Sequence, residues 1–520
     1  MSASPVHVGG TLGDVIISAL NRYPDRIAFV CDGRSYRYRE VRQQVSRAVQ
    51  ALRALGLGKG DSLVQLTRNL PEQWFVMAAA YLLGLKSVTL HAMGSIDDHA
   101  FVIDDAAAAA VIVDGHFESR AQELRARCPA VTRWFCHGDS ATLAPFWLAA
   151  GAFEPAPLVD ETGPEDIVRI AYTGGTTGRP KGVLLSSRSM LFQALLSLIE
   201  KDWPDDPIFL CAAPISHGAG ANIIPTLSRG GTFVMMPGFN VERVLEAIEQ
   251  HRASVLYVVP TMLYGLLDHP RTRAADLSSL RSIMYGASPA FPTRIREAID
   301  VFGPILCQTY GQTEAPSSIT VLRKCDHDRD DLKRLSSCGL PYPGIQVDVL
   351  DQDCAPVEQG SIGEICVRGP IVMSGYWKQP DLTAEAFRGG WLHTGDMAYR
   401  DEAGFYYIVD RKKDMIITGG FNVYPREVED VLAAHPDVAA AAVIGVPDAK
   451  WGEAVKAVIV PRAGAQPSAE DLIALVREKK GPVNAPKSVE FVAALPLTAV
   501  GKPDKAALRR AHGVGEGHVG

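Results

Sequence analysis

Residues Tyr172–Val183 read YTGGTTGRPKGV, and this stretch decides how the rest of the chain is interpreted. It follows a short apolar run, Ile167–Ala171, which predicts a strand. It precedes an amphipathic stretch that predicts a helix starting near Ser186 or Ser187. The segment is therefore expected to form a loop between a strand and a helix.

The composition of this loop suits a phosphate group. Glycines let the backbone approach a ligand closely, and backbone N–H groups, threonine hydroxyls and a lysine all bind phosphate oxygens. The order differs from a Walker A loop, in which Gly-Lys is followed directly by Ser or Thr, because Arg179 and Pro180 separate the last loop glycine from Lys181. An ordinary glycine-rich turn is the alternative, and the strand–loop–helix context argues against it.

A second polar segment, Tyr310–Glu314 (YGQTE), follows the predicted strand Ile305–Thr309. The tyrosine ring can stack on a base, and the threonine can donate a hydrogen bond to a phosphate. The carboxylate of Glu314 is a hard oxygen ligand of the kind that Mg²⁺ prefers. Alone, this segment could be a surface turn, so its weight comes from its combination with the first loop.

The first loop resembles the phosphate-binding loop of the adenylate-forming superfamily, which contains acyl-CoA synthetases, peptide-synthetase adenylation domains and luciferases. The family usually has Ser where this chain has Gly174, which keeps the backbone donor and loses one hydroxyl. Tyr310–Glu314 is similar to the second core motif of that family. The resemblance runs from about Thr11 to Arg510, with the motifs in family order.

The resemblance implies roles for residues of the large N-terminal part. Asp396, the last residue of WLHTGD, corresponds to the aspartate that holds the ribose hydroxyls, and Arg411 to an arginine that reaches the nucleotide. The implied residues for binding ATP are Thr173, Gly174, Gly175, Thr177, Gly178, Lys181, Gly286, Ala287, Ser288, Tyr310, Gly311, Thr313, Asp396 and Arg411. The implied catalytic residues are Thr176, Glu314, which also binds the metal, His217 at the acyl pocket, and Lys502.

The C-terminal part resembles the mobile unit of the family. Pro496–Lys502 (PLTAVGK) matches the motif of the mobile catalytic lysine. A cation about 4 Å from the developing anion contributes on the order of 4 kcal/mol at an effective dielectric constant near 20, or roughly a thousandfold in rate. Lys413, within the charged segment Asp410–Asp414, falls on the hinge position, and this segment is expected to be a solvated linker.

The same part carries the residues implied for coenzyme A. Gly419 and Gly420 open the GGFNVYP loop, which resembles the wall of the pantetheine tunnel, and Trp451 matches an aromatic residue that packs near CoA. Relatives often carry a basic residue where this chain has Asn484-Ala485, so contact with the CoA nucleotide is expected from Lys487 or other residues.

Alternation of strand and helix patterns over residues 11–160 and 167–319 predicts an α/β fold with two sheets covered by helices. From residue 339, short alternating strands predict a small antiparallel barrel or sheet. We expect a large domain over residues 1–411, with subdomains at about 1–160, 161–325 and 326–411. Residues 412–520 are expected to form a small, mobile α+β lid.

The composition limits the function classes. The net charge of −7 gives no basic face for nucleic acid, so none is expected as a partner. Nine cysteines without a CxxC pair argue against a disulfide framework or a zinc site. The N-terminus shows no signal peptide, and the longest apolar run, Trp74–Leu85, is too short for a transmembrane segment. We therefore expect a cytoplasmic protein, and homodimer formation is left open.

These observations predict an ATP- and Mg²⁺-dependent acid–thiol ligase that forms an acyl-adenylate and passes the acyl group to CoA by domain alternation. The small residues Ala219–Ala221 favour an aromatic, alicyclic or medium-chain acid. The alternatives are an acyl-AMP ligase that loads a carrier protein and a long-chain fatty acyl-CoA synthetase. A luciferase-like oxidase and a non-enzymatic nucleotide-binding scaffold are the more distant ones.

Overall fold

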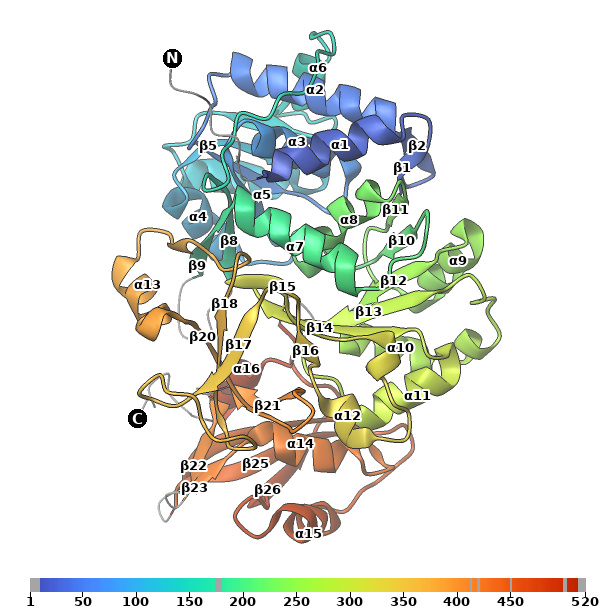
Figure 1. Cartoon of the computed structure of the whole chain (residues 1–520), viewed down its shortest axis with the longest axis vertical. Coiled ribbons are helices and arrows are strands. Elements are labelled where there is room, and N and C mark those ends of the chain that lie inside the picture. The colour runs from blue at the N-terminus through green and yellow to red at the C-terminus, as the bar shows by residue number, and fades with distance from the viewer. Residues whose placement is uncertain are drawn as a thin grey trace.

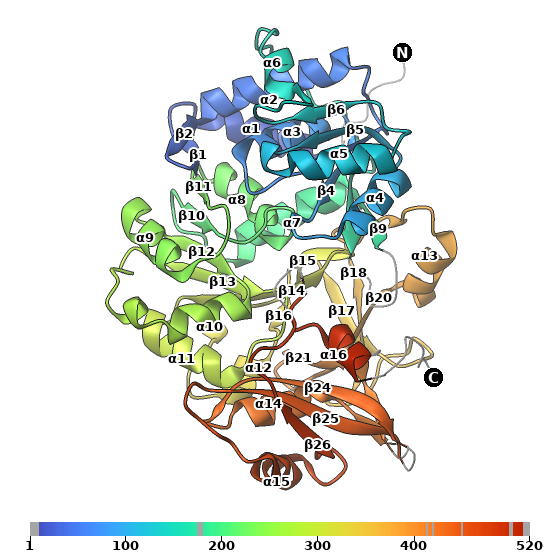
Figure 2. The same cartoon turned by 180° about the vertical axis from the view of Figure 1, so that it is seen from behind.

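The structure is a computed structural model that describes residues 10–173, 180–411, 414–418, 421–448, 451–498 and 503–512. Two large sheets and their helices form the upper and middle parts of the molecule in Figure 1. The small four-stranded sheet lies below the eight-stranded sheet and beside the lower strands of the nine-stranded sheet, and the C-terminal unit forms the opposite end (Figures 1 and 2). The predicted α/β class with a smaller C-terminal unit is confirmed.

The first large sheet has eight strands in the order β19-β9-β8-β4-β3-β5-β6-β7. Strands β3 to β8 are parallel to their neighbours, and β8, β9 and β19 are antiparallel. The strands are β3 (Ser62–Leu66), β4 (Lys86–Leu90), β5 (Ala108–Val113), β6 (Trp134–Cys136), β7 (Ala144–Pro145), β8 (Ile167–Thr173), β9 (Lys181–Ser186) and β19 (Gly375–Tyr376).

The second large sheet has nine strands in the order β16-β15-β14-β13-β12-β10-β11-β1-β2. Its centre, from β14 to β1, is parallel. The strands are β1 (Ile27–Cys31), β2 (Arg34–Arg37), β10 (Ile208–Cys211), β11 (Thr232–Met235), β12 (Val255–Val258), β13 (Ser282–Gly286), β14 (Leu306–Gln312), β15 (Ala315–Leu322) and β16 (Leu340–Pro341).

The two large sheets exchange segments across the expected boundary near residue 160. Strand β1 pairs with β11, so the N-terminal hairpin joins the later sheet, and β8 pairs with β4, so a later strand joins the earlier sheet. Sequence alternation cannot reveal such an exchange, because it reports element types and not their partners. The boundary near residue 160 therefore does not separate the two sheets.

Helices cover both sheets and meet between them. The helices of the large part are α1 (Leu12–Arg22), α2 (Tyr38–Ala54), α3 (Pro71–Leu82), α4 (Ile96–Asp105), α5 (Glu118–Arg127), α6 (Phe146–Ala150), α7 (Ser187–Glu200), α8 (Ile223–Ser228), α9 (Val241–His251), α10 (Pro260–Asp268), α11 (Pro292–Phe302), α12 (Leu332–Ser336) and α13 (Pro380–Ala386). The ring of Phe29 contacts those of Trp74 and Phe233 at centroid distances of 5.3 and 6.2 Å, which joins β1, α3 and β11 in one core.

Helix α3 explains the longest apolar run of the sequence. Most of its side chains are buried, including Trp74 and Phe75, so it is a core helix between elements of the two sheets. Within the described ranges, no helix has both the length and the apolar composition needed to cross a membrane.

The small sheet contains β17 (Gln346–Leu350), β18 (Gly363–Arg368), β20 (Leu392–Arg400) and β21 (Tyr406–Arg411), all antiparallel. The sequence predicted a small antiparallel barrel or sheet. The described strands form a sheet, in the order β17-β18-β20-β21. The C-terminal unit contains β22 (Ile416–Thr418), β23 (Phe421–Val423), α14 (Pro425–Ala433), β24 (Val438–Asp448), β25 (Gly452–Pro461), α15 (Ala469–Lys480), β26 (Ser488–Phe491) and α16 (Lys505–Ala511).

Candidate active site

The polar segments of the nine-stranded sheet lie at one edge. Strands β10, β12, β13 and β14 are parallel neighbours, so their carboxyl ends face the same side. His217 lies after β10. Gly286 is the last residue of β13, and Ala287 and Ser288 follow it. Tyr310 is near the end of β14. This is the edge at which open α/β sheets bind ligands.

The first loop connects two strands and not a strand and a helix. Thr173, at the end of β8, pairs with Lys181, at the start of β9, and α7 then begins at Ser187 as predicted. We did not predict β9, because its residues continue the loop motif. The expected ligand residues Gly174, Gly175, Thr176, Thr177 and Gly178 lie outside the described residues.

Two tyrosines hold the strands on either side of this loop. The Tyr172 hydroxyl donates to Asp105 Oδ2 at 2.6 Å. The ammonium of Lys181 lies 6.0 Å from the centroid of the Tyr376 ring. Strand β19, which carries Tyr376, pairs with β9. The structure therefore places Thr173 and Lys181 opposite each other at the base of the loop.

The Tyr310–Glu314 segment starts inside β14 and is not a separate turn after the strand. Tyr310, Gly311 and Gln312 belong to β14, and the chain then turns into β15 at Ala315. A Cβ at Gly311 would lie 2.5 Å from the backbone nitrogen of Ser317. Close packing within the hairpin therefore accounts for this glycine without any ligand.

Glu314 joins the two large sheets at the turn of this hairpin. Its carboxylate accepts a hydrogen bond of 2.9 Å from the Tyr376 hydroxyl, and its carbonyl accepts one of 2.8 Å from the N–H of Met373. Tyr376 lies between this carboxylate and Lys181, and a carboxylate in such a place fits Mg²⁺, which proteins commonly hold by one or two carboxylates together with substrate phosphates. When bound, the ion would neutralise phosphate charge.

The turn after β13 is closely packed and strained. A Cβ at Gly286 would lie 2.3 Å from the carbonyl oxygen of Thr309 on β14. Ala287 has a φ of +68°, which L-residues other than Asn and Asp seldom adopt. The backbone at Gly286–Ser288 is thus fixed in an unusual conformation beside Tyr310, as functional loops often are.

Asp396 is the buried centre of an ionic cluster. Its side chain is 4% exposed, its Oδ1 lies 2.5 Å from Arg411 Nε, and its Oδ2 accepts a hydrogen bond of 2.6 Å from the Tyr310 hydroxyl. The Asp396 carboxylate raises the pKa of Arg411, and burial together with Asp396 raises the pKa of Tyr310. The tyrosine therefore stays protonated and donates to the aspartate.

This cluster brings together three of the predicted nucleotide residues from two sheets. Tyr310 comes from β14 of the nine-stranded sheet, whereas Asp396 and Arg411 are paired neighbours on β20 and β21 of the small sheet. Taken singly, Asp396 and Arg411 resembled solvated surface charges in the sequence. Their contact shows that the small sheet completes the site.

The segment Asp410–Asp414 is not a solvated linker at its described ends. Asp410 is buried, and both of its oxygens accept backbone N–H groups, from Arg411 at 2.6 Å and from Arg426 at 2.9 Å. Asp414 pairs with Arg509 of α16 at 2.8 Å. Lys413, the predicted hinge residue, lies outside the described residues.

His217 lies in the expected segment but is exposed to solvent. Its ring meets the ring of His91 edge-on at a centroid distance of 4.7 Å, and its Nδ1 lies 2.9 Å from the Ser216 hydroxyl. Arg169 of β8 donates to the Ser216 carbonyl at 2.7 Å. His217 therefore stands where the two large sheets meet, and its role toward the acid stays a prediction.

In the C-terminal unit, Trp451 is 40% exposed, and the ammonium of Lys487 lies 5.7 Å from the centroid of its ring. The structure thus pairs the two residues that the sequence suggested for CoA. Asn484 donates to the carbonyl of Lys480, and Ala485 is buried. Gly419, Gly420 and Lys502 lie outside the described residues.

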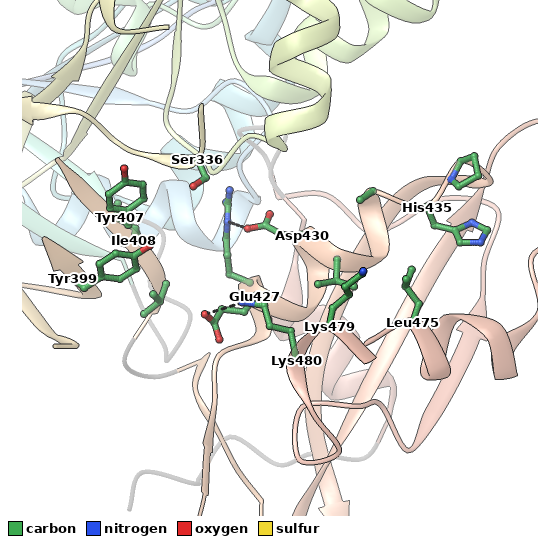
Figure 3. Close-up of a pocket in the computed structure, with 15 residues that line it drawn as sticks. Ser336, Tyr399, Tyr407, Ile408, Glu427, Asp430, His435, Leu475, Lys479 and Lys480 are labelled. Atoms are coloured by element: carbon green, nitrogen blue, oxygen red, sulfur yellow. Dashed lines mark hydrogen bonds and ion pairs between the residues drawn. The ribbon is translucent and has the colours of Figure 1, made fainter. Parts of the chain in front are cut away.

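A cavity of about 520 Å³ lies between the small sheet and the C-terminal unit (Figure 3). The stacked rings of Tyr399 and Tyr407 form one side, and Glu427 and Lys480 form part of the other. Arg426 borders the cavity and donates from Nη2 to the Ala290 carbonyl of the large part at 2.9 Å. This bond fixes the C-terminal unit close to the Gly286–Ser288 turn.

Sequence reasoning missed three residues that organise the site. Tyr376 orients Glu314, Arg426 joins the two parts of the chain, and Glu364 contacts the turn before Asp396. In the sequence, these residues stand out only as part of an aromatic pair after Gly375 and as a glutamate inside an apolar strand. Tyr376, Arg426 and Glu364 each contact residues that are far away in the sequence, and composition and spacing do not predict such contacts.

Comparison with known proteins identifies the class. The family model of the AMP-binding enzyme matches residues 17–377, and that of the AMP-binding enzyme C-terminal domain matches residues 427–502. The chain belongs to this family, as the resemblance predicted. The ionic cluster of Asp396, Arg411 and Tyr310 therefore lies in an enzyme of the AMP-binding family.

Particular relatives cover almost the whole chain. A medium/long-chain-fatty-acid–CoA ligase, FadD8, of Mycobacterium tuberculosis is 44% identical over 99% of this chain and 92% of its own. A feruloyl-CoA synthase of Amycolatopsis sp is 36% identical over 96% of this chain and 99% of its own. The solved structure of the amide bond synthetase McbA from Marinactinospora thermotolerans superposes with a TM-score of 0.89 at 35% identity, over 96% and 99% of the two chains.

Proposed function

We propose that this protein is an ATP-dependent acid–CoA ligase that joins a carboxylic acid to AMP and then transfers the acyl group to CoA. The observation that carries the proposal is the buried Asp396 carboxylate, held by Tyr310 and Arg411 at the sheet edge. A fixed carboxylate with two oxygens is a suitable acceptor for two vicinal hydroxyls, such as those of ribose. Lys181 and Glu314 supply the cation and the hard oxygen ligand for the phosphates and Mg²⁺.

CoA is the proposed acceptor because of the C-terminal unit. Trp451 and Lys487 form an exposed aromatic and cationic pair, which suits a ligand with an adenine ring and phosphates. The names of two relatives, a fatty-acid–CoA ligase and a feruloyl-CoA synthase, point to the same acceptor. A carrier protein is the alternative acceptor.

The proposed acid is a medium-chain, aromatic or alicyclic carboxylic acid. The relatives named above act, by their names, on medium- or long-chain fatty acids and on a feruloyl group. The residues after His217 are small, with Ala219 buried and Gly220 packed against the Ile215 carbonyl. Long-chain fatty acids are the alternative that the FadD8 name keeps open.

The domain boundary, the hinge and the role of Lys502 remain proposals. The family models leave residues 378–426 between them, which accommodates a domain boundary after residue 411 and a hinge at Lys413. Lys502 is proposed as the lysine that stabilises negative charge during adenylation. A cytoplasmic location and homodimer formation also stay proposals.

The test is pyrophosphate release across a panel of carboxylic acids, with and without CoA, together with mass detection of the acyl-CoA product. Holo-carrier protein replaces CoA in a parallel arm. We expect acid-dependent pyrophosphate release and CoA-dependent thioester formation. Absence of ATP–pyrophosphate exchange with every acid would refute the proposal, and thioester formation on carrier protein alone would change the acceptor.

Lys502→Ala separates the two half-reactions. Because the proposed role is charge stabilisation during adenylation, we expect pyrophosphate release to fall by roughly a thousandfold. Conversion of supplied acyl-AMP and CoA should be largely retained, as followed by AMP release. Equal loss of both half-reactions would contradict domain alternation.

A further inference from the structure

The strand that carries Asp396 leaves the regular ladder just at that residue. Glu364 on β18 pairs with Met397 on β20, and Cys366 pairs with His393. The three residues Thr394–Asp396 are therefore placed opposite Ile365 alone. Such a bulge breaks the local ladder, so its backbone groups need other partners.

Side chains supply these partners. The N–H of Gly395 donates to Glu364 Oε1 at 2.8 Å, and the N–H of Asp396 donates to Thr394 Oγ1 at 3.1 Å. The Thr394 hydroxyl donates to the Ile365 carbonyl at 2.8 Å, which closes the bulge. Gly395 has a φ of +72°, a conformation that glycine adopts without strain.

Glu364 is itself held in place. Its side chain is 9% exposed, and its second oxygen, Oε2, lies 3.2 Å from His393 Nδ1. The other ring nitrogen, Nε2, lies 3.1 Å from the Arg388 carbonyl oxygen. A buried carboxylate on β18 thus connects the His393 ring with the backbone of the bulge on β20.

The bulge aims the Asp396 side chain. Asp396 and Arg411 are directly paired between β20 and β21, and the Asp396 carboxylate also meets the Tyr310 hydroxyl. A shift of the bulge would turn the carboxylate away from both contacts. The direction of the proposed ribose ligand therefore depends on residues that do not themselves reach the nucleotide cluster.

We propose that Glu364, braced by His393, is a positioning residue for nucleotide selection, because it holds the Thr394–Asp396 bulge that aims the Asp396 carboxylate. This inference rests on the proposed function of Asp396 as the ribose ligand. It assigns Glu364 a role in choosing between nucleotides with and without ribose hydroxyls. A purely structural role would affect folding stability without changing that choice.

The test compares ATP with 2′-deoxy-ATP and 3′-deoxy-ATP in pyrophosphate release by the full-length enzyme. The variants are Asp396→Asn, Glu364→Ala and Glu364→Gln, and the control is Glu358→Gln at an exposed glutamate on the same small β unit. KM for ATP, KM for CoA and the midpoint of thermal unfolding are measured for each. Glutamine keeps an oxygen that can accept the partly buried Gly395 N–H, whereas alanine removes this acceptor.

We expect Glu364→Ala to raise KM for ATP by up to about tenfold, the upper range of what the loss of one hydrogen bond costs. KM for the deoxynucleotides should change much less, so the preference for ATP should largely disappear. Glu364→Gln should retain most of the preference, KM for CoA should stay constant, and Glu358→Gln should match the wild type. Asp396→Asn should remove the preference in the same way.

The outcomes separate the inference from the function on which it rests. If Asp396→Asn keeps the full preference for ATP, the ribose role of Asp396 is wrong. If Asp396→Asn loses the preference but Glu364→Ala keeps it and only lowers the unfolding midpoint, the positioning role is wrong. If Glu364→Ala does not fold, His393→Ala, which removes the brace of Glu364, decides in its place: an unchanged preference for ATP in that variant refutes the proposal.

Discussion

Two buried aspartates on neighbouring strands have opposite electrostatic surroundings. Asp396 on β20 contacts the Arg411 guanidinium and the Tyr310 hydroxyl. Asp410 on β21 is paired in register with Met397, the next residue of β20, and among the described residues its two oxygens accept hydrogen bonds from backbone N–H groups. Burial raises the pKa of Asp410 to about 6, and the nearby Lys505 lowers it only in part.

The difference shows that the direct partners of a buried carboxylate, and not burial alone, define its surroundings. Asp396 lies in contact with the Arg411 guanidinium and the Tyr310 hydroxyl. Asp410 receives the N–H of Arg426 from the C-terminal unit, and burial raises its pKa to about 6. The same small sheet therefore presents a cation-paired carboxylate to the proposed nucleotide site and a pH-sensitive group to the interdomain contact.

The largest expected effect comes from removing the Asp396 carboxylate. Asp396→Ala leaves the Tyr310 hydroxyl and the half-exposed Arg411 guanidinium without their shared acceptor, and a hydrogen bond to a charged group contributes about 1.5–3 kcal/mol. We expect kcat/KM for ATP to fall by about ten- to a hundredfold, measured by ATP–pyrophosphate exchange. Asp381→Asn, at an exposed aspartate of α13, is the control and should match the wild type.

Asp410→Asn should change the pH dependence of stability. The fold raises the pKa of Asp410 to about 6, whereas the same carboxyl group in the unfolded chain has a pKa of about 4. As the pH rises, the unfolded chain therefore loses this proton at a lower pH than the folded chain does. The group therefore lowers the free energy of unfolding progressively between about pH 4 and pH 6, by about 3 kcal/mol in total. Asparagine does not ionise, so the variant should lack this decline.

Unfolding midpoints of wild type and Asp410→Asn between pH 4 and pH 8 measure the effect. The midpoint of the variant relative to the wild type should increase with pH up to about 6 and then stay constant. Asp353→Asn, at an exposed aspartate, should give no such trend. A constant difference between Asp410→Asn and the wild type at every pH would contradict the predicted titration.

Arg426→Ala should weaken the contact between the two parts of the chain. The guanidinium donates to the Ala290 carbonyl at 2.9 Å and lies 3.4 Å from Asp430, one of whose oxygens is buried without a hydrogen-bond partner. Its loss should cost about 1–3 kcal/mol. We expect faster proteolytic cleavage between the two parts and a lower rate of adenylation, whereas Arg477→Ala on the exposed face of α15 should change neither.

The smallest expected effect is at the proposed CoA pair. Trp451→Ala removes an exposed ring and its contact with Lys487, which is worth about 0.5–1 kcal/mol, so KM for CoA should rise about two- to fivefold. KM for ATP should not change. Phe491→Ala, at another exposed aromatic residue, is the matched control. An unchanged KM for CoA would remove Trp451 from the acceptor site.

Local pattern predicted the elements of the fold well, because hydrophobic periodicity and caps act within a few residues. The helix expected to start near Ser186 or Ser187 begins at Ser187, with the Ser186 side chain accepting the Ser189 N–H. Strand β9 was missed, because its first residues belong to the phosphate loop. The strand predicted at Ile305–Thr309 continues to Gln312, so Tyr310 lies inside β14 and not after it.

The sequence by itself determined the chemistry of the protein: a loop of glycines, threonines and Lys181, a carboxylate at Glu314, and the order of the motifs, which placed the chain in its family. Only the tertiary structure decided which charges are paired. Asp396 and Asp410 look alike in the sequence, yet one contacts the Arg411 guanidinium and the other accepts backbone N–H groups. The reason is physical, since the pKa of a carboxyl group depends on neighbours and burial that strand pairing creates across long sequence distances.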